Sequence, residues 1–199
     1  MQNAVEHLSR DPILKAIIDR VTLEPILPTD DLYFYLLRAI VFQQLSGKAA
    51  ATIHRRFLDL FPDGYPHPHL LLEAETATLR SAGLSGQKAG YVQNIARFFT
   101  EEKLINKDLS YLSDEELIAY LTQIKGVGKW TVEMLLMFGM DRPDVLPLDD
   151  LVIFQAIRNL YELEGNKREL KVQMTAIAEA WRPFRSTACR YLWRYKDEG

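Results

Sequence analysis

Apolar residues recur along this chain at the three-to-four-residue spacing of amphipathic helices. A first helix is predicted from apolar positions that stop before Pro25 and Pro28: Leu8, Ile13, Ile17, Ile18 and Val21. From residue 32 the run LYFYLLRAIVFQQL is apolar nearly all round, and either Asp30 or Asp31 can cap it. We therefore expect this second helix to lie at the centre of the fold.

Later helices follow from the same spacing and from Pro and Gly punctuation. They are predicted at 48–61, 68–73, 76–82, 87–99, 113–124, from about 129, 150–162, 167–181 and after Pro183. Ser113 and Glu116 form a capping box for the helix before residue 124. Alternating runs that would predict strands do not occur, so the predicted class is all-α.

A tight reversal of the chain separates two of these helices. The helix that ends near Ile124 meets Gly126-Val127-Gly128, and a new helix must begin near Lys129. The first N–H groups of that helix, together with the amides of Gly126 and Gly128, predict an anion cradle suited to a phosphate group. Lys125 and Lys129 flank it.

Composition predicts a soluble protein of one or two small domains, with 199 residues of which 48% are hydrophobic. No stretch approaches the ~20 apolar residues of a membrane span, and no signal peptide opens the chain, so a cytoplasmic protein is expected. The single cysteine, Cys189, excludes an internal disulfide and a four-cysteine iron–sulfur cluster. The scattered histidines make no zinc pattern.

The net charge of −3 argues mildly against a nucleic-acid partner. However, basic residues gather near the C-terminus: Arg182, Arg185, Arg190, Arg194 and Lys196. Such a local basic face could still bind DNA.

The motifs resemble the helix-hairpin-helix DNA glycosylases, in particular the 3-methyladenine DNA glycosylase II branch. The resemblance rests on GVGKWT and a Pro-x-Asp-Asp segment that places Asp150 twenty residues after Trp130. It extends to three further segments: RAIVFQQLS at 38–46, GLSGQKAGYV at 83–92 and WRPFRSTACRYLW at 181–193.

The resemblance implies a two-lobed helical fold with a DNA-binding cleft between the lobes. Lobe one would span about 30–140, with the hairpin at 121–131. Lobe two would combine about 1–29 with 141–199, and the N-terminal β domain of longer relatives is not expected.

Asp150 is the candidate catalytic residue. It begins a helix, where the helix dipole favours an ionised carboxylate, although an Asp at such a position often serves only as a helix cap. We expect Asp149 to be the cap, leaving Asp150 for catalysis, as the resemblance implies. A carboxylate beside the anomeric carbon either stabilises the oxocarbenium ion or orients water.

The resemblance also implies a base pocket of Trp130, Trp193, Met134 and Gln43. Trp130 stands where relatives with strand-cleaving lyase activity have a lysine, so a monofunctional enzyme is expected. Indole faces can stack on a cationic alkylpurine. Ordinary core packing is the alternative for each Trp, and for Met134 it is equally favoured.

Gln44 matches the side chain that fills the gap left by an extruded nucleotide, the wedge; a helix-end amide is the alternative. Arg38 is expected in a buried ion pair. The resemblance adds Arg185 as a phosphate ligand. It also suggests a monovalent cation, Na⁺ or K⁺, at the backbone carbonyls of Thr122, Ile124 and Val127, with no other cofactor.

Together these features predict a monofunctional DNA-3-methyladenine glycosylase that flips alkylated purines from double-stranded DNA and hydrolyses the N-glycosidic bond in base excision repair. We expect it to act as a monomer, with no membrane partner, and on the nucleoid if the source is bacterial. One alternative is a non-catalytic helix-hairpin-helix DNA-binding module. Another is a glycosylase for mismatched or oxidised bases.

Overall fold

The computed structural model describes residues 2–198, and all regular secondary structure in that range is helical. The all-α prediction is therefore confirmed. The chain forms two compact units: unit 1 contains residues 1–27 and 136–199, and unit 2 contains residues 28–135. Unit 1 is thus built from both ends of the chain, whereas unit 2 is one continuous segment.

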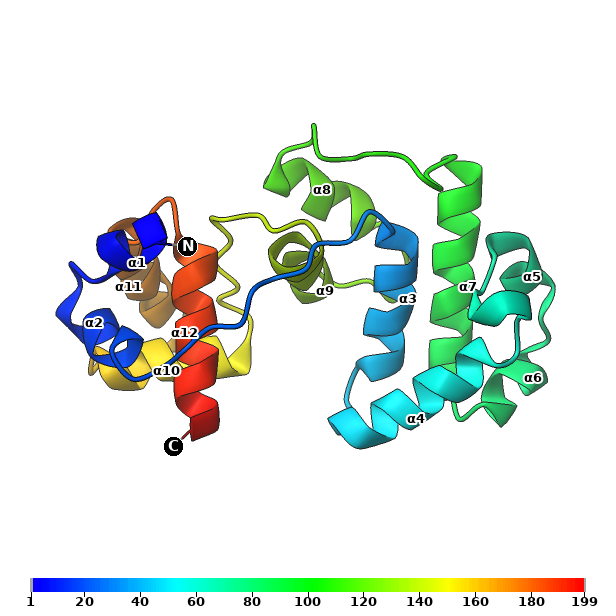
Figure 1. Ribbon diagram of the computed structural model, residues 1–199, viewed down its shortest axis with the longest axis horizontal. Coiled ribbons are helices and arrows are strands. Elements are labelled where there is room, and N and C mark those ends of the chain that lie inside the picture. The colour runs from blue at the N-terminus through cyan, green and yellow to red at the C-terminus, as the bar shows by residue number, and fades with distance from the viewer. Residues whose placement is uncertain (1, 199) are drawn as a thin grey trace. The chain divides into compact units, whose positions relative to one another are not determined.

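Unit 2 is organised around two helices that pack against each other, α3 and α7 (Figure 1). Its elements are α3 (Leu32–Phe42), α4 (Gly47–Leu58), a 3₁₀ turn (Pro62–Gly64), α5 (Pro68–Glu73), α6 (Thr76–Ser81), α7 (Gly86–Glu101), α8 (Asp114–Leu121) and α9 (Lys129–Met134). The inward side chains of α3 are fully buried: Leu36, Leu37, Ile40 and Val41. The central place predicted for this helix is confirmed within unit 2, because a helix that is apolar on most of its sides needs several partners.

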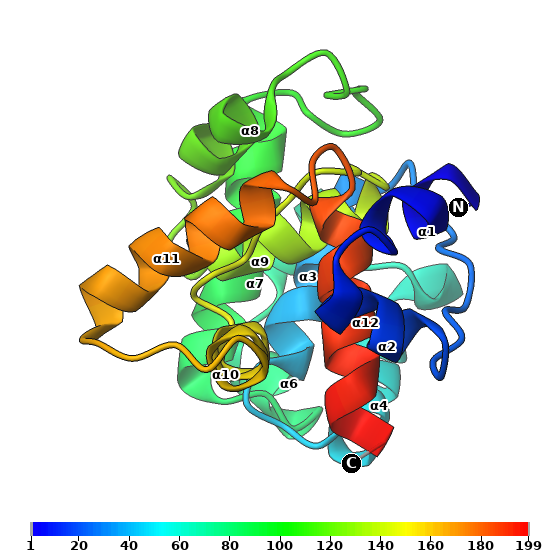
Figure 2. The same cartoon turned by 90° about the vertical axis from the view of Figure 1, so that its left-hand side faces the viewer.

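Unit 1 is organised around α12, which packs against α10 and α2 (Figure 2). Its elements are α1 (Gln2–Leu8), α2 (Pro12–Ile18), α10 (Leu151–Leu160), α11 (Lys167–Glu179) and α12 (Arg185–Glu198). A π-helical turn at Leu135–Gly139 leads into this unit. Segments from opposite ends of the chain therefore share one core.

The prediction of one continuous first helix is wrong. The chain breaks between α1 and α2, and Asp11 caps α2 by accepting hydrogen bonds from the backbone N–H groups of Ile13 and Leu14. Pro12 occupies the first turn of α2, where its missing N–H is tolerated. The helical spacing ran across this break because both helices bury apolar faces.

Two predicted helix starts agree with the structure. The Ser113 and Glu116 capping box is present, and Asp31 caps α3 by accepting from the N–H of Phe34. In the described part of the chain, no helix combines the length and apolarity needed to cross a bilayer.

Candidate functional site

The candidate catalytic carboxylate, Asp150, lies at the N-cap of α10 and is half-buried. Its Oδ1 accepts a hydrogen bond from the backbone N–H of Ile153 at 2.9 Å. The same oxygen accepts a second bond from the indole Nε1–H of Trp193, on α12, at 3.0 Å. Two donors, one from the helix N-terminus and one from the indole, therefore hold this oxygen in place.

The expected division of roles between the two adjacent aspartates is wrong. Asp150, not Asp149, caps α10, because the helix begins at Leu151. The Asp149 side chain is 47% exposed and pairs with Lys171 Nζ at 2.5 Å. Asp150 therefore combines the cap with the position proposed for catalysis.

Trp193 lies against a second aromatic ring in unit 1. Its ring centroid is 5.7 Å from that of Phe138, which the π-helical turn contributes. The indole is half-buried, so one part of it packs while its N–H holds Asp150. Asp150 and Trp193 are the two predicted site residues that the structure brings into direct contact in unit 1.

Side chains of α7 contact the hairpin between α8 and α9 in unit 2. Gly126 has φ +108°, and a Cβ added there would lie 2.3 Å from the ring of Tyr91. Asn94 donates from Nδ2 to the carbonyl of Lys125 at 3.0 Å. A glycine is thus required both by the backbone angle and by the close approach of Tyr91.

Gly128 is the N-cap of α9, and both flanking lysines are exposed. Lys129 Nζ lies 3.4 Å from Oε1 of the buried Glu133. In the first turn of α9 the N–H groups of Thr131 and Val132 donate to the carbonyl of Gly128, at 3.0 and 3.2 Å, so an anion could be bound only by N–H groups that precede them. The phosphate role of Gly126, Gly128, Lys125 and Lys129 stays a prediction.

Trp130 and Met134 follow on α9. Trp130 is 42% exposed, and Met134 is half-buried with its carbonyl accepting from Tyr35 Oη at 2.9 Å. The stacking role of Trp130 stays a prediction, and its indole lies partly exposed in the first turn after the hairpin.

Gln43 and Gln44 end α3 in different ways. Gln43 donates from Nε2 to Thr131 Oγ1 at 3.3 Å, so its amide is directed at α9. Gln44 is exposed and has φ +57°, a left-handed conformation that is uncommon for a residue with a Cβ. The two glutamines are therefore not interchangeable.

Comparison with known proteins identifies the family. The model described as the HhH-GPD superfamily of base excision DNA repair proteins matches residues 37–183, which include the hairpin and Asp150. The chain belongs to this superfamily.

Relatives and solved structures similar to this chain are named as 3-methyladenine DNA glycosylases. DNA-3-methyladenine glycosylase 1 of Schizosaccharomyces pombe is 40% identical over 164 residues, covering 81% of this chain and 71% of the relative. The structure of the S. pombe 3-methyladenine DNA glycosylase in complex with abasic DNA has TM-score 0.83 at 35% identity, covering 98% and 97% of the two chains. The crystal structure of a Bacillus halodurans DNA-3-methyladenine glycosidase has TM-score 0.79 at 31% identity, covering 96% and 89%.

Two arginines lie in surroundings other than those predicted from the sequence. Arg185 is only 13% exposed, and its guanidinium bonds Asp144, with Nε to Oδ1 at 2.7 Å. It is therefore turned inward rather than offered to a phosphate. Arg38 is exposed and lies over the ring of Phe42 at 4.3 Å, so the expected buried ion pair is wrong.

Two arginines of the C-terminal basic cluster, Arg182 and Arg185, pair with acids. Arg182 also pairs with Asp144, at 2.6 Å, and with Glu179, at 2.9 Å. Arg190 donates to the carbonyl of Glu24. Sequence clustering overstated the basic face because it does not reveal which acids fold against the arginines.

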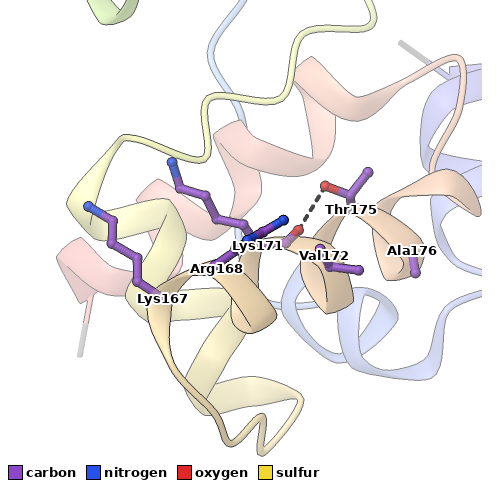
Figure 3. Close-up of a pocket in the computed structure, with 6 residues that line it drawn as sticks. All are labelled: Lys167, Arg168, Lys171, Val172, Thr175 and Ala176. Atoms are coloured by element: carbon purple, nitrogen blue, oxygen red, sulfur yellow. Dashed lines mark hydrogen bonds between the residues drawn. The ribbon is translucent and has the colours of Figure 1, made fainter.

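A separate hollow of about 710 Å³ runs along α11 (Figure 3). It is lined by Lys167, Arg168, Lys171, Val172, Thr175 and Ala176, all on this one helix. Val172 is 66% exposed, and none of the proposed base-pocket residues lines the hollow. We therefore do not assign the base pocket to it.

The monovalent cation expected at the hairpin carbonyls of Thr122, Ile124 and Val127 stays a prediction. Helix α8 ends at Leu121 with Thr122 as its C-cap, which releases carbonyls from the helical ladder. The carbonyl of Ile124 accepts from Val127 N–H at 2.9 Å and keeps a second lone pair. Neutral carbonyls are suitable ligands for such a cation. Among the described residues, no group of three His, Cys, Asp or Glu side chains could hold a metal ion.

Sequence reasoning missed three residues of α7 that support the site. Lys88, Tyr91 and Asn94 recur every three residues and contact the end of α3 or the hairpin. Their spacing places them along one side of a helix, a signal present in the segment GLSGQKAGYV and its continuation.

Proposed function

We propose that this protein is a base excision repair glycosylase that removes alkylated purines from double-stranded DNA. The observation that carries the proposal is the Asp150 carboxylate, fixed at the start of α10 by the indole N–H of Trp193. Membership of the superfamily and relatives named as DNA-3-methyladenine glycosylases support it.

The proposed reaction is hydrolysis of the bond between the purine and C1′ of the sugar. The bond's electron pair leaves with the base, which neutralises an alkylated cationic ring. The oxygen of water then bonds to C1′ and releases a proton. Asp150 would balance the positive charge that develops on the sugar, or orient the water, with its Oδ1 already held by two donors.

The proposed enzyme is monofunctional. Trp130 carries no amine, so it cannot form the Schiff base with the sugar that precedes strand cleavage by a lyase. Borohydride reduction during turnover should therefore trap no covalent protein–DNA adduct. A trapped adduct would contradict this part of the proposal.

The proposed partner is double-stranded DNA with alkylated bases, bound by a monomer in the compartment that holds the DNA. Phosphate contact is assigned to the hairpin amides with Lys125 and Lys129, and stacking on the flipped base to Trp130. A monovalent cation at the hairpin carbonyls would bring positive charge near a phosphate.

The test is release of free base from duplex DNA methylated with a nitrosourea, separated by chromatography, with unmethylated duplex as control. We expect 3-methyladenine among the products and intact strands until alkali is added. An absence of base release, with hairpin-dependent DNA binding retained, would instead favour a non-catalytic DNA-binding module.

A further inference from the structure

The turn that carries Gln44 has an unusual backbone. Gln44 adopts φ +57°, and the residue before it, the C-cap Gln43, leaves the helical region with ψ 132°. Conformations of this kind persist when neighbouring groups fix them. The exposed Gln44 side chain therefore needs a support on the backbone that precedes it.

Lys88 supplies this support. From the first turn of α7, its Nζ donates to the carbonyls of Val41 at 2.8 Å and of Gln43 at 2.7 Å. A cation there complements the negative end of α3 and satisfies carbonyls that the helix leaves open. The ammonium is half-buried, and burial lowers its pKa from the ordinary value.

The bond to Gln43 acts directly on Gln44. The carbonyl of Gln43 and the N–H of Gln44 belong to one rigid peptide plane. Holding that oxygen sets the tilt of the plane, and the tilt fixes the direction in which the chain enters Gln44. Lys88 therefore acts on the backbone of this turn, through the carbonyls of Val41 and Gln43.

The same helix also holds the hairpin. Tyr91 packs under Gly126 and Asn94 bonds the carbonyl of Lys125, one and two turns beyond Lys88. Both features lie in unit 2, so α7 fixes the spacing between the Gln44 turn and the proposed phosphate site.

We propose that Lys88 is a positioning residue that holds Gln44 ready to enter the DNA stack when a damaged nucleotide is extruded. This inference rests on the proposed function. It predicts that Lys88 matters where a base stack must be opened and matters little for cleavage of a base that is already unstacked.

The first measurement needs no catalysis. A duplex with an abasic-site analogue beside 2-aminopurine reports unstacking as a rise in fluorescence when saturated with protein. Lys88→Met keeps the chain length but removes the donors, and should reduce this rise strongly. Lys88→Arg should largely restore it, and Lys107→Met, at an exposed lysine elsewhere in unit 2, should leave it unchanged.

The second measurement is single-turnover base release from one methylated sequence, presented as duplex and as single strand. Lys88→Met should lower duplex release by about tenfold or more and single-strand release by less than about threefold. In a Gln44→Ala background, Lys88→Met should add less than about twofold, because both changes remove one function. Thermal melting checks folding, and Lys88→Gln serves if the Met variant does not fold.

The outcomes are distinct. Equal losses on duplex and single strand, or fully additive effects with Gln44→Ala, would overturn the role of Lys88. So would a wild-type protein that leaves the duplex stacked. A wild type that unstacks the duplex but releases no base would refute the proposed glycosylase alone, and Lys88 is then judged by fluorescence.

Discussion

Two aspartates in unit 1, Asp11 and Asp150, cap helices and accept from tryptophan indoles, but they distribute their bonds differently. Asp11 Oδ1 accepts from the backbone N–H groups of Ile13 and Leu14, while its Oδ2 accepts from Tyr161 Oη at 2.5 Å and Trp181 Nε1 at 3.0 Å. At Asp150 the cap bond from the N–H of Ile153 and the indole bond from Trp193 share one oxygen, Oδ1.

The indole that bonds Asp11 is more buried than the indole that bonds Asp150. Trp181 is fully buried, and burial together with the bond to Asp11 raises the pKa of Tyr161 above its ordinary value. Asp11 thus joins the first helices of the chain to two distant segments of the same core. The comparison teaches that an Asp cap with an indole partner is not in itself a sign of catalysis; the cap and indole bonds fall on different oxygens of Asp11 but on one oxygen of Asp150.

The sharpest test of this contrast is Asp150→Asn. The amide still caps α10 and its oxygen can accept from Trp193, but it cannot balance an oxocarbenium charge. We expect single-turnover base release to fall by about two to four orders of magnitude with DNA binding retained. Unchanged base release would show that Asp150 takes no part in the reaction.

Asp11→Ala should give the opposite pattern. It removes a cap and leaves the indole of Trp181 and the hydroxyl of Tyr161 without their acceptor. The free energy of unfolding should fall by about 2–4 kcal/mol. Base release measured well below the melting temperature should stay near wild type. Denaturant unfolding and excision assays on the same preparation would reveal any catalytic role.

Trp193→Phe asks what the indole N–H contributes. The ring remains to pack on Phe138, but one of the two donors to Asp150 Oδ1 is lost. Base release should fall by about tenfold, since a charge-assisted bond contributes about 1.5–3 kcal/mol. A matched Trp181→Phe variant should lose stability instead.

The smallest effect is expected from Asp149→Asn. Its ion pair with Lys171 is partly exposed, and such pairs contribute about 1 kcal/mol or less. Melting should shift slightly and base release should not change. If Asp149→Asn abolished release while Asp150→Asn retained it, the assignment of the catalytic acid would be wrong by one residue.

Much of the fold could be predicted because local spacing determines it. The central position of α3, the Ser113 capping box and the reversal at Gly126 each depend on neighbouring residues. The break at Pro12 was missed because apolar residues continue on both sides of it. Proline tolerates the first turn of a helix, so it marks a start as readily as an end.

The candidate site was harder to predict from the sequence than the fold. Asp149 and Asp150 are equally good caps, and a one-residue difference in where α10 begins decides between them. The partners of Arg185 and Lys88 lie 41 to 47 residues away in sequence. No local pattern reveals such pairs, so the inward turn of Arg185 and the support of the Gln44 turn required the structure.

The division of unit 1 between the two ends of the chain bears on synthesis. A ribosome that has released residues 1–135 has delivered all of unit 2, hairpin included, but only the opening segment of unit 1. Asp11 can accept its hydrogen bonds from Tyr161 and Trp181 only after these residues, 150 and 170 positions downstream, have been synthesised. Domains can fold as their sequence emerges from the ribosome. The hairpin proposed to bind phosphate can therefore fold before Asp150 is in place. If Asp150 acts as proposed, base release therefore becomes possible only after unit 1 has been synthesised and has folded.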